Sequence, residues 1–131
     1  MIYARSPLEA YRWQSRIVIV FADAGTMEKL AQQHRTLASD LGGLKDRDLL
    51  IVTVQEDLVN IDGIASHSIG ADRLRDAFDV RGQGYSILLI GKDGGVKMRS
   101  KELVAKKDLF ALIDGMPMRQ REMRTRSRSE P

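Results

Sequence analysis

The sequence predicts an α/β fold in which helices flank a central mixed sheet, and three observations support this prediction. Residues 17–21 are a continuous apolar, β-branched run, which is typical of a strand buried on both faces, and residues 48–54, DLLIVTV, are expected to form a second buried strand. Between them, apolar residues recur at helical spacing, so the three segments form a βαβ unit that is expected to be right-handed. The sequence GKDGG then joins two further strand-like runs and suits a hairpin turn.

The first strand runs directly into a helix. Asp23 to Thr26 interrupt the apolar run, and Thr26 has a side chain suited to cap the start of a helix. Apolar positions then recur at helical spacing up to residue 41. We expect Gly42 and Gly43 to end this helix, because glycine is favoured just beyond a helix C-terminus.

The elements after the second strand are expected as follows. Residues 55–70 show no clear period and are interpreted as a loop. A short helix, a third strand, a hairpin turn, a strand with one solvated face and a last helix then occupy residues 70–78, 85–90, 91–95, 96–100 and 106–114. Gly115 and Pro117 are expected to end the last helix.

The resulting order is βαβ, α, a ββ hairpin and α. A doubly wound sheet would continue to alternate strands and helices, whereas a hairpin followed by a closing helix is the order of a thioredoxin-like sheet. We therefore expect residues 1–118 to form a single thioredoxin-like domain. Residues 119–131 are expected to form a basic, flexible C-terminal tail, because residues 124–131 contain no apolar side chain to bury.

Residues 78–97, FDVRGQGYSILLIGKDGGVK, resemble the part of thioredoxins and peroxiredoxins that runs from the second helix through the central hairpin. Two departures from that pattern concern the chemistry. Tyr85 stands where those proteins have a cis-proline, and Asp23 to Thr26 replace the cysteine motif that follows the first strand. The resemblance therefore implies the scaffold of these proteins without their redox residues.

Four further segments resemble the bacterial branch of the P-DUDES family of uncharacterised thioredoxin-like domains. These segments are LEAYRWQSRIVIVFA, DRDLLIV, LLIGKDGGVKMRS and LFALIDGMPMRQREM. The resemblance covers nearly all of residues 8–123. It implies a thioredoxin-like fold of unsettled function and supplies no catalytic residues.

The composition excludes several classes of chemistry. The chain has no cysteine, which removes disulfides, thiolate metal sites and thiol catalysis together. The GKDGG segment lacks the spacing of a phosphate-binding loop, and we expect no cofactor and no metal. No apolar run reaches the length of a transmembrane helix, and the first residues lack the apolar core of a signal peptide. We expect a cytoplasmic protein unless a leader has been removed.

The charge distribution argues against nucleic acid as a partner. The chain has a net charge of +3, and its last 13 residues, with five arginines and two glutamates, carry this whole excess. A nucleic-acid-binding fold usually shows its basic patch on the folded surface. Weak binding of a polyanion through the tail stays an alternative function.

The candidate site lies where the first strand meets its helix. Ligands of α/β proteins bind at the carboxyl ends of strands, and the free N–H groups of a helix start attract anions. We expect a small polar cleft in which this junction faces the start of the third strand, formed by Asp23, Gly25, Thr26, Arg81, Gly84 and Tyr85. In the alternative interpretation Asp23 and Thr26 only cap the helix, and Arg81 forms a structural ion pair with Asp23.

Three other features carry a structural and a functional interpretation. The segment Met116, Pro117, Met118 and Arg119 either packs back on the sheet or offers a methionine surface to a partner. His34 lies on the apolar stripe of the first helix and is expected to be packed and hydrogen-bonded. His67 is expected in a surface loop.

The leading hypothesis is a binding or interaction module without thiol chemistry, whose partner is a protein or a small anionic ligand. The second hypothesis is a cysteine-independent enzyme with Asp23 as acid or base and Arg81 as the group that holds an anion. The third is the polyanion binder described above.

Overall fold

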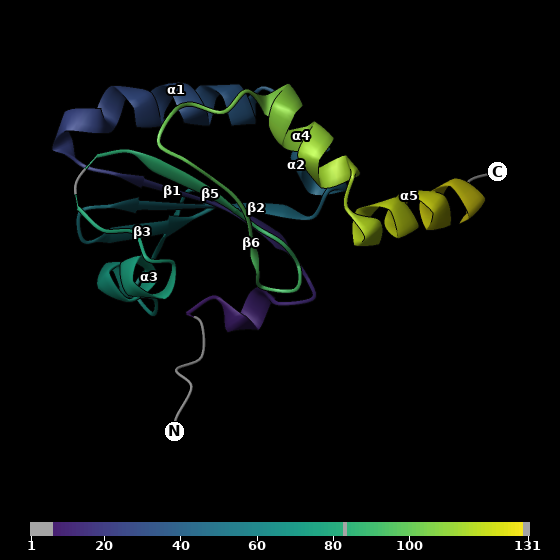
Figure 1. Ribbon diagram of the computed structural model, residues 1–131, viewed down its shortest axis with the longest axis horizontal. Coiled ribbons are helices and arrows are strands. Elements are labelled where there is room, and N and C mark those ends of the chain that lie inside the picture. Colours follow the sequence, from purple (N-terminus) through teal and green to yellow (C-terminus); the bar gives the residue numbers. More distant parts are fainter. Residues whose placement is uncertain (1–6, 83, 130–131) are drawn as a thin grey trace.

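The protein is represented by a computed structural model that describes residues 7–82 and 84–129, with side chains up to residue 126. Its centre is a six-stranded sheet with the order β4-β3-β2-β1-β5-β6 and helices on both faces (Figure 1). The strands are β1 (Arg16–Ala22), β2 (Leu49–Gln55), β3 (Leu58–Ile61), β4 (Ile64–Ser66), β5 (Ser86–Ile90) and β6 (Val96–Ser100). β1 pairs in parallel with β2 and antiparallel with β5, so the sheet is mixed as predicted.

The central strand β1 is buried along its whole length. Ile19 lies opposite Val52 of β2 and Leu88 of β5. Successive side chains of a strand point to opposite faces, so Val18 and Val20 enter one core and Ile17 and Ile19 the other. Two buried faces explain why the sequence of this strand is continuously apolar rather than alternating.

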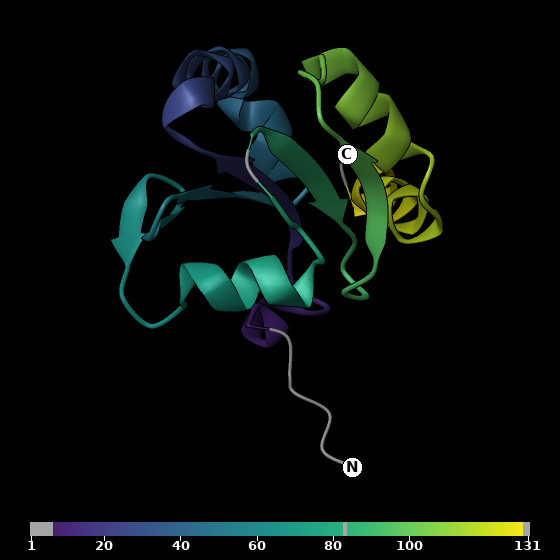
Figure 2. The same cartoon turned by 60° about the vertical axis from the view of Figure 1, so that its left-hand side comes forward.

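Helices form a layer on each face of the sheet. α1 (Met27–Ala38), α2 (Leu41–Asp46) and α4 (Lys106–Asp114) cover one face, and α3 (Ala71–Ala77) covers the other together with the short 3-10 helix η1 (Glu9–Tyr11) (Figures 1 and 2). Each layer brings apolar side chains onto the sheet, such as Leu37 and Leu109 on the first face and Leu74 on the second.

The prediction of a loop over residues 55–70 was wrong, because these residues hold the β3–β4 hairpin. Asp62 and Gly63 form its two-residue turn, with φ angles of 50° and 82°. An Asp-Gly pair with positive φ at both positions is a strong hairpin signal. The alternation of the strands is weak because Leu58 and Ile64 are exposed on this outer hairpin.

The first helix also ends earlier than predicted. α1 stops at Ala38, and Asp40 starts α2 by accepting a hydrogen bond from the Gly43 N–H at 2.8 Å. Gly42 and Gly43 therefore lie inside a second helix rather than at the end of the first. A Cβ atom on Gly43 would lie 2.7 Å from Phe110 Cε2, so glycine permits the close approach of α2 and α4.

The segment predicted as a tail begins with regular structure. α5 (Pro117–Ser129) starts at Pro117, a residue favoured at the first position of a helix. Arg119 is buried, and Arg126 forms an ion pair with Asp46. The first turns of α5 are thus attached to the domain across the expected boundary at residue 118. The flexibility of residues 119–131 stays a prediction.

Candidate functional site

The junction between β1 and α1 lies against the loop that precedes β5. The two oxygens of the Asp23 carboxylate accept different hydrogen bonds, one from the Gly84 N–H at 2.7 Å and one from the Thr26 hydroxyl at 2.9 Å. The Thr26 hydroxyl oxygen also accepts a hydrogen bond from the Asp23 N–H at 3.0 Å. The structure thus brings Asp23, Thr26 and Gly84 together around the 3-10 helix η2 (Ala24–Thr26) that leads into α1.

These hydrogen bonds stabilise the ionised form of the Asp23 carboxyl group. The hydrogen bond from the Thr26 hydroxyl, followed by that from the Gly84 N–H, lowers the pKa of Asp23 below its ordinary value. Asp23 is therefore ionised at neutral pH, and each of its oxygens already has a donor. A general acid needs a raised pKa instead. The geometry is that of a carboxylate that caps a helix start and holds a loop.

The structure corrects the expected positions of Arg81 and Tyr85. The Arg81 side chain is 78% exposed and pairs with Asp79 at 2.8 Å rather than with Asp23. Tyr85 is buried in the core, where its hydroxyl donates a hydrogen bond to Gln33 Oε1 at 2.7 Å, and burial raises the pKa of Tyr85. Neither side chain therefore takes the expected place beside Asp23.

The hollow at this corner is small and acidic. Its volume is about 170 Å³, and Asp23, Glu56 and Asp57 line it together with Arg75. Glu56 accepts a hydrogen bond from the Ala24 N–H at 3.1 Å, and Arg75 donates one to the Glu56 carbonyl at 2.6 Å. The excess of carboxylates makes this corner a poor site for the anionic ligand that the sequence suggested.

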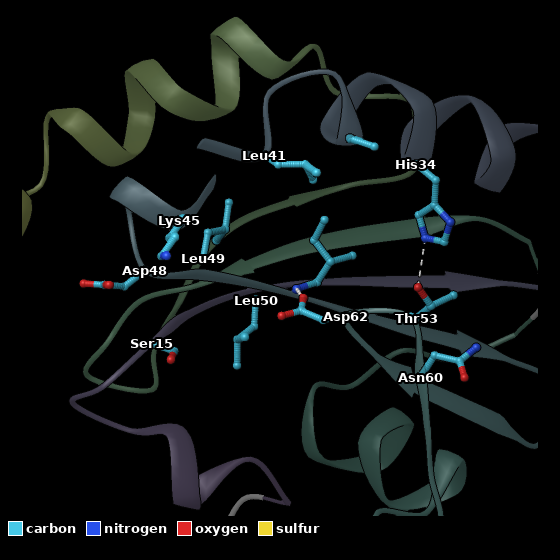
Figure 3. Close-up of a pocket in the computed structure, with 13 residues that line it drawn as sticks. Ser15, His34, Leu41, Lys45, Asp48, Leu49, Leu50, Thr53, Asn60 and Asp62 are labelled. Carbon is cyan, nitrogen blue, oxygen red and sulfur yellow. Dashed lines mark hydrogen bonds between the residues drawn. The ribbon is translucent and has the colours of Figure 1, made fainter. Parts of the chain in front are cut away.

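A larger hollow lies between the α1–α2 layer and the β2–β3 part of the sheet (Figure 3). Its volume is about 720 Å³. We call it the His34 hollow and define it by His34, Ala38, Leu41, Leu49, Ile51 and Thr53. Asn60 of β3 adds an amide to the lining, Lys45 adds a positive charge, and Asp48 and Asp62 add negative charges.

His34 and Thr53 supply the central polar contact of this hollow. The His34 ring points from α1 toward Thr53 on β2, and its Nε2 lies 2.9 Å from Thr53 Oγ1 (Figure 3). Burial lowers the pKa of His34, so the ring is neutral at pH 7. The expectation that His34 is packed and hydrogen-bonded is confirmed. The hollow beside it was missed, although the polar Thr53 within an apolar strand was a possible signal.

A third hollow, of about 660 Å³, lies between the β5–β6 turn and the α4–α5 connection. We call it the Arg16 hollow and define it by Arg16, Lys92, Lys97, Leu112, Met116 and Met118. Pro117 also lines it, so three residues of the expected interaction segment share one hollow. Arg119 is the exception, because its buried guanidinium pairs with Asp46 at 2.6 Å and with Asp114 at 3.0 Å.

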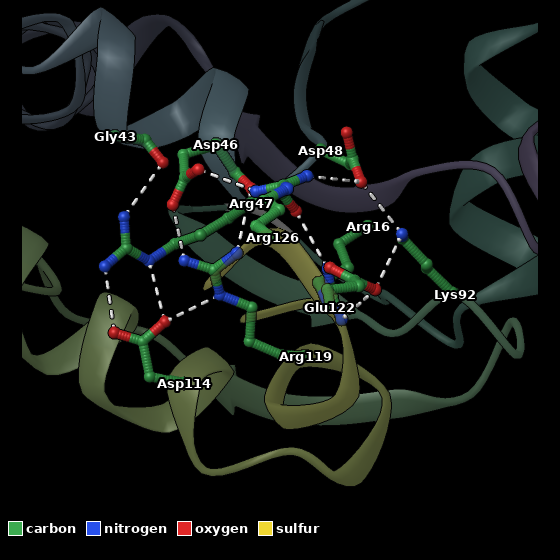
Figure 4. A network of polar contacts seen from close by, with 10 residues as sticks. All are labelled: Arg16, Gly43, Asp46, Arg47, Asp48, Lys92, Asp114, Arg119, Glu122 and Arg126. Atoms are coloured by element: carbon green, nitrogen blue, oxygen red, sulfur yellow. Dashed lines mark hydrogen bonds and ion pairs between the residues drawn. The ribbon is translucent and has the colours of Figure 1, made fainter. Parts of the chain in front are cut away.

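An ion-pair network behind this hollow joins α2, α4, α5 and β1 (Figure 4). Asp114 accepts hydrogen bonds from Arg47 and Arg119. Burial alone would raise the pKa of Asp114, but these two guanidinium groups lower it overall. Arg119 is therefore a structural residue, because the carboxylates of Asp46 and Asp114 neutralise its charge.

The described part of the chain holds neither a cluster of metal ligands nor a membrane-spanning helix. No group of three His, Cys, Asp or Glu side chains there is arranged to hold a metal ion. No helix there combines the length and the apolar character that crossing a bilayer requires.

Comparisons with known proteins agree with this architecture. The sequence model of a family described as a domain of unknown function (DUF4174) matches residues 7–122. The crystal structure of reduced 2-Cys peroxiredoxin from Plasmodium vivax is similar, with a TM-score of 0.60 and 10% sequence identity over 87% of this chain and 84% of that chain. This likeness confirms the predicted thioredoxin-like fold and, at such low identity, shows the fold alone. No curated protein matches the chain.

Proposed function

The chain belongs to the DUF4174 family of domains of unknown function, and we propose that it is a non-catalytic binding domain whose ligand lies in the His34 hollow. The observation that carries this proposal is the His34–Thr53 hydrogen bond inside an otherwise largely apolar hollow of about 720 Å³. Ligand pockets of proteins have volumes of about 300–1,000 Å³ and combine apolar walls with a few polar groups. A histidine with a shifted pKa is a further mark of functional sites.

The lining of the hollow suggests a small uncharged organic ligand. Leu41, Leu49 and Ile51 offer apolar contact. The neutral His34 ring and the amide of Asn60 can donate or accept a hydrogen bond without a net charge. Lys45 is positive and Asp48 and Asp62 are negative, and Lys92 pairs with Asp48 at 2.9 Å, so the charges around the hollow do not favour an ion of either sign.

The arrangement supports binding better than catalysis. A hydroxyl next to a histidine resembles a nucleophile and its base, but that chemistry also needs a group that orients the base. Among the described residues, the hydrogen-bond partner of the His34 ring is Thr53, with no carboxylate on the other nitrogen. Thr53 is itself buried in β2, which shields its hydroxyl from a substrate. At the other corner, Asp23 is a poor general acid because its pKa is lowered, and a poor base because both of its oxygens already accept hydrogen bonds.

The P-DUDES assignment and a bacterial source belong to the proposal too. They rest on the sequence segments that resemble the bacterial branch of that family, and all but the last residue of these segments fall within the residues matched by the DUF4174 model.

A pair of tryptophan variants tests where a ligand binds. Ala38 is an exposed residue at the end of α1 that lines the His34 hollow, and Ala38→Trp fills part of its volume. Ala31 is exposed on the same helix outside that lining, so Ala31→Trp is the matched control. A library of uncharged aromatic amides and heterocycles is screened for compounds that raise the melting temperature.

The proposal predicts that compounds which stabilise the wild-type protein also stabilise Ala31→Trp, and that Ala38→Trp loses this stabilisation. Equal stabilisation of Ala38→Trp by the same compounds would contradict the proposed location. Turnover of such a compound by the pure protein would contradict the non-catalytic role.

A further inference from the structure

Arg16, the first residue of β1, has a buried side chain that is only 1% exposed. Its two terminal nitrogens donate hydrogen bonds to the Glu122 carboxylate at 3.1 and 3.0 Å, and one of them also donates to the Arg47 carbonyl at 2.9 Å. The third nitrogen, Nε, is buried and has no acceptor among the residues that the structure describes. A buried donor without an acceptor is unfavourable, so a ligand that brings an acceptor to Nε would gain binding energy there.

The Arg16 hollow offers hydrogen-bond donors and apolar surfaces to such a ligand. Arg16, Lys92 and Lys97 line the hollow with three cationic groups, which Glu122, Asp48 and Asp93 pair with in turn. Lys92 Nζ donates to Asp48 at 2.9 Å and to Glu122 at 2.8 Å, which uses two of the three donors of an ammonium group (Figure 4). The unused donors of Arg16 and Lys92, rather than a net charge, therefore favour a ligand group with more than one acceptor oxygen.

The remaining walls are apolar. Leu112 and Met116 come from α4 and its end, and Pro117 and Met118 come from the start of α5. Leucine and methionine favour hydrocarbon in contact with them, and methionine side chains adapt to different shapes. A small inorganic anion would leave these walls without a contact, whereas an anionic group on a hydrocarbon chain uses both surfaces.

We propose that the Arg16 hollow binds a free monocarboxylate on an unbranched apolar chain. The carboxylate oxygens accept hydrogen bonds from Arg16 Nε and Lys92 Nζ, and the chain lies along Leu112 and Met116. This site is separate from the His34 hollow, because the two hollows share no lining residue. Either proposal can therefore fail without the other.

The test titrates the full chain with octanoate, octan-1-ol and acetate below the micellar range. The ¹H–¹⁵N signal of Arg16 Nε, assigned through bonds from its backbone, reports directly on the unpartnered donor. We expect octanoate to shift this signal and to bind at least tenfold more tightly than either control ligand, because octanol lacks the carboxylate and acetate lacks the chain.

Two leucine variants test the apolar wall. Leu112 lines the hollow and Leu103 does not, yet their exposures are nearly equal at 41% and 42%. Leu112→Asp is expected to weaken octanoate binding at least tenfold, and Leu103→Asp to change it less than twofold. The proposal is overturned if octan-1-ol binds as tightly as octanoate, if the Arg16 Nε signal stays in place, or if Leu112→Asp binds like the wild type. Octanoate shifts confined to His34 and Ile51 would also overturn it.

Discussion

Asp23 and Gly84 are separated by 61 residues in the sequence, and the Asp23 carboxylate accepts a hydrogen bond from the Gly84 N–H at 2.7 Å. Gly84 has a φ of 108°, a conformation that other residues rarely adopt, so this loop depends on its glycine. The contact joins the end of β1 to the loop before β5. Asp23 therefore has a structural role at the corner where the sequence suggested a binding cleft.

Replacement of Asp23 tests this structural role. Asp23→Ala removes both acceptors and is expected to lower the melting temperature more than Asp23→Asn, which keeps one oxygen. Asp57→Ala, at another carboxylate of the same corner, is the control and is expected to have little effect. Thermal unfolding followed by circular dichroism measures all three. An unchanged melting temperature in Asp23→Ala, together with loss of a ligand, would show that the corner is a binding site instead.

The burial of His34 predicts a pH dependence of stability. Its pKa is lowered in the folded protein, so below a pH of about 6.5 the unfolded chain binds more protons at this position. The free energy of unfolding should therefore fall as the pH drops from 6.5 through the folded pKa. His34→Gln is expected to reduce this loss between pH 7 and pH 5, and His67→Gln, at an exposed histidine, to leave it as in the wild type. Equal pH profiles for His34→Gln and the wild type would contradict the assignment.

Two adjacent glycines of α2 are predicted to respond in opposite directions to alanine. Gly42→Ala should stabilise the protein by about 0.5–1 kcal/mol, because its Cβ meets only ordinary contacts and alanine favours helix. Gly43→Ala should destabilise it, because its Cβ would lie 2.5 Å from an Asp40 oxygen and 2.7 Å from Phe110. Chemical denaturation of both variants measures the difference. Stabilisation by Gly43→Ala would show that α2 and α4 are not this close.

The attachment of α5 is tested at Glu122. Burial raises the pKa of this carboxyl, but hydrogen bonds from Arg16 and Lys92 lower it overall. Glu122→Gln leaves the buried Arg16 guanidinium without its counter-charge, and we expect a cost of about 3 kcal/mol in the free energy of unfolding. A chain that ends after Met123 keeps this contact and should lose less than about 1 kcal/mol, because the removed ion pairs of Arg126 are exposed. Equal losses of unfolding free energy in Glu122→Gln and in the shortened chain would contradict the claim that α5 is held mainly through Glu122.

The sequence was sufficient for features that depend on local pattern. The continuous apolar run of β1 and the GKDGG turn predicted the sheet, and the strand–helix junction placed Asp23 near the start of β5. Features that depend on contacts between distant residues were missed. The break between α1 and α2 depends on Asp40 and on the approach of Gly43 to Phe110.

The same distinction explains the errors at the site. Tyr85 turns into the core because the buried Gln33 offers it an acceptor, which spacing along the chain does not reveal. The His34 hollow arises where α2 and the β3–β4 hairpin both border β2, and the sequence pattern predicted neither element. The Asp62–Gly63 turn was the one available signal for that hairpin.

The most direct test of the central claim is a map of backbone amide shifts when a stabilising compound from the uncharged library is added to ¹⁵N-labelled protein. The proposed function predicts that the largest shifts occur at His34, Ile51, Thr53 and Asn60, around the His34 hollow. Largest shifts at Asp23, Thr26 and Gly84 would instead place the ligand at the corner where β1 meets α1 and would contradict the account.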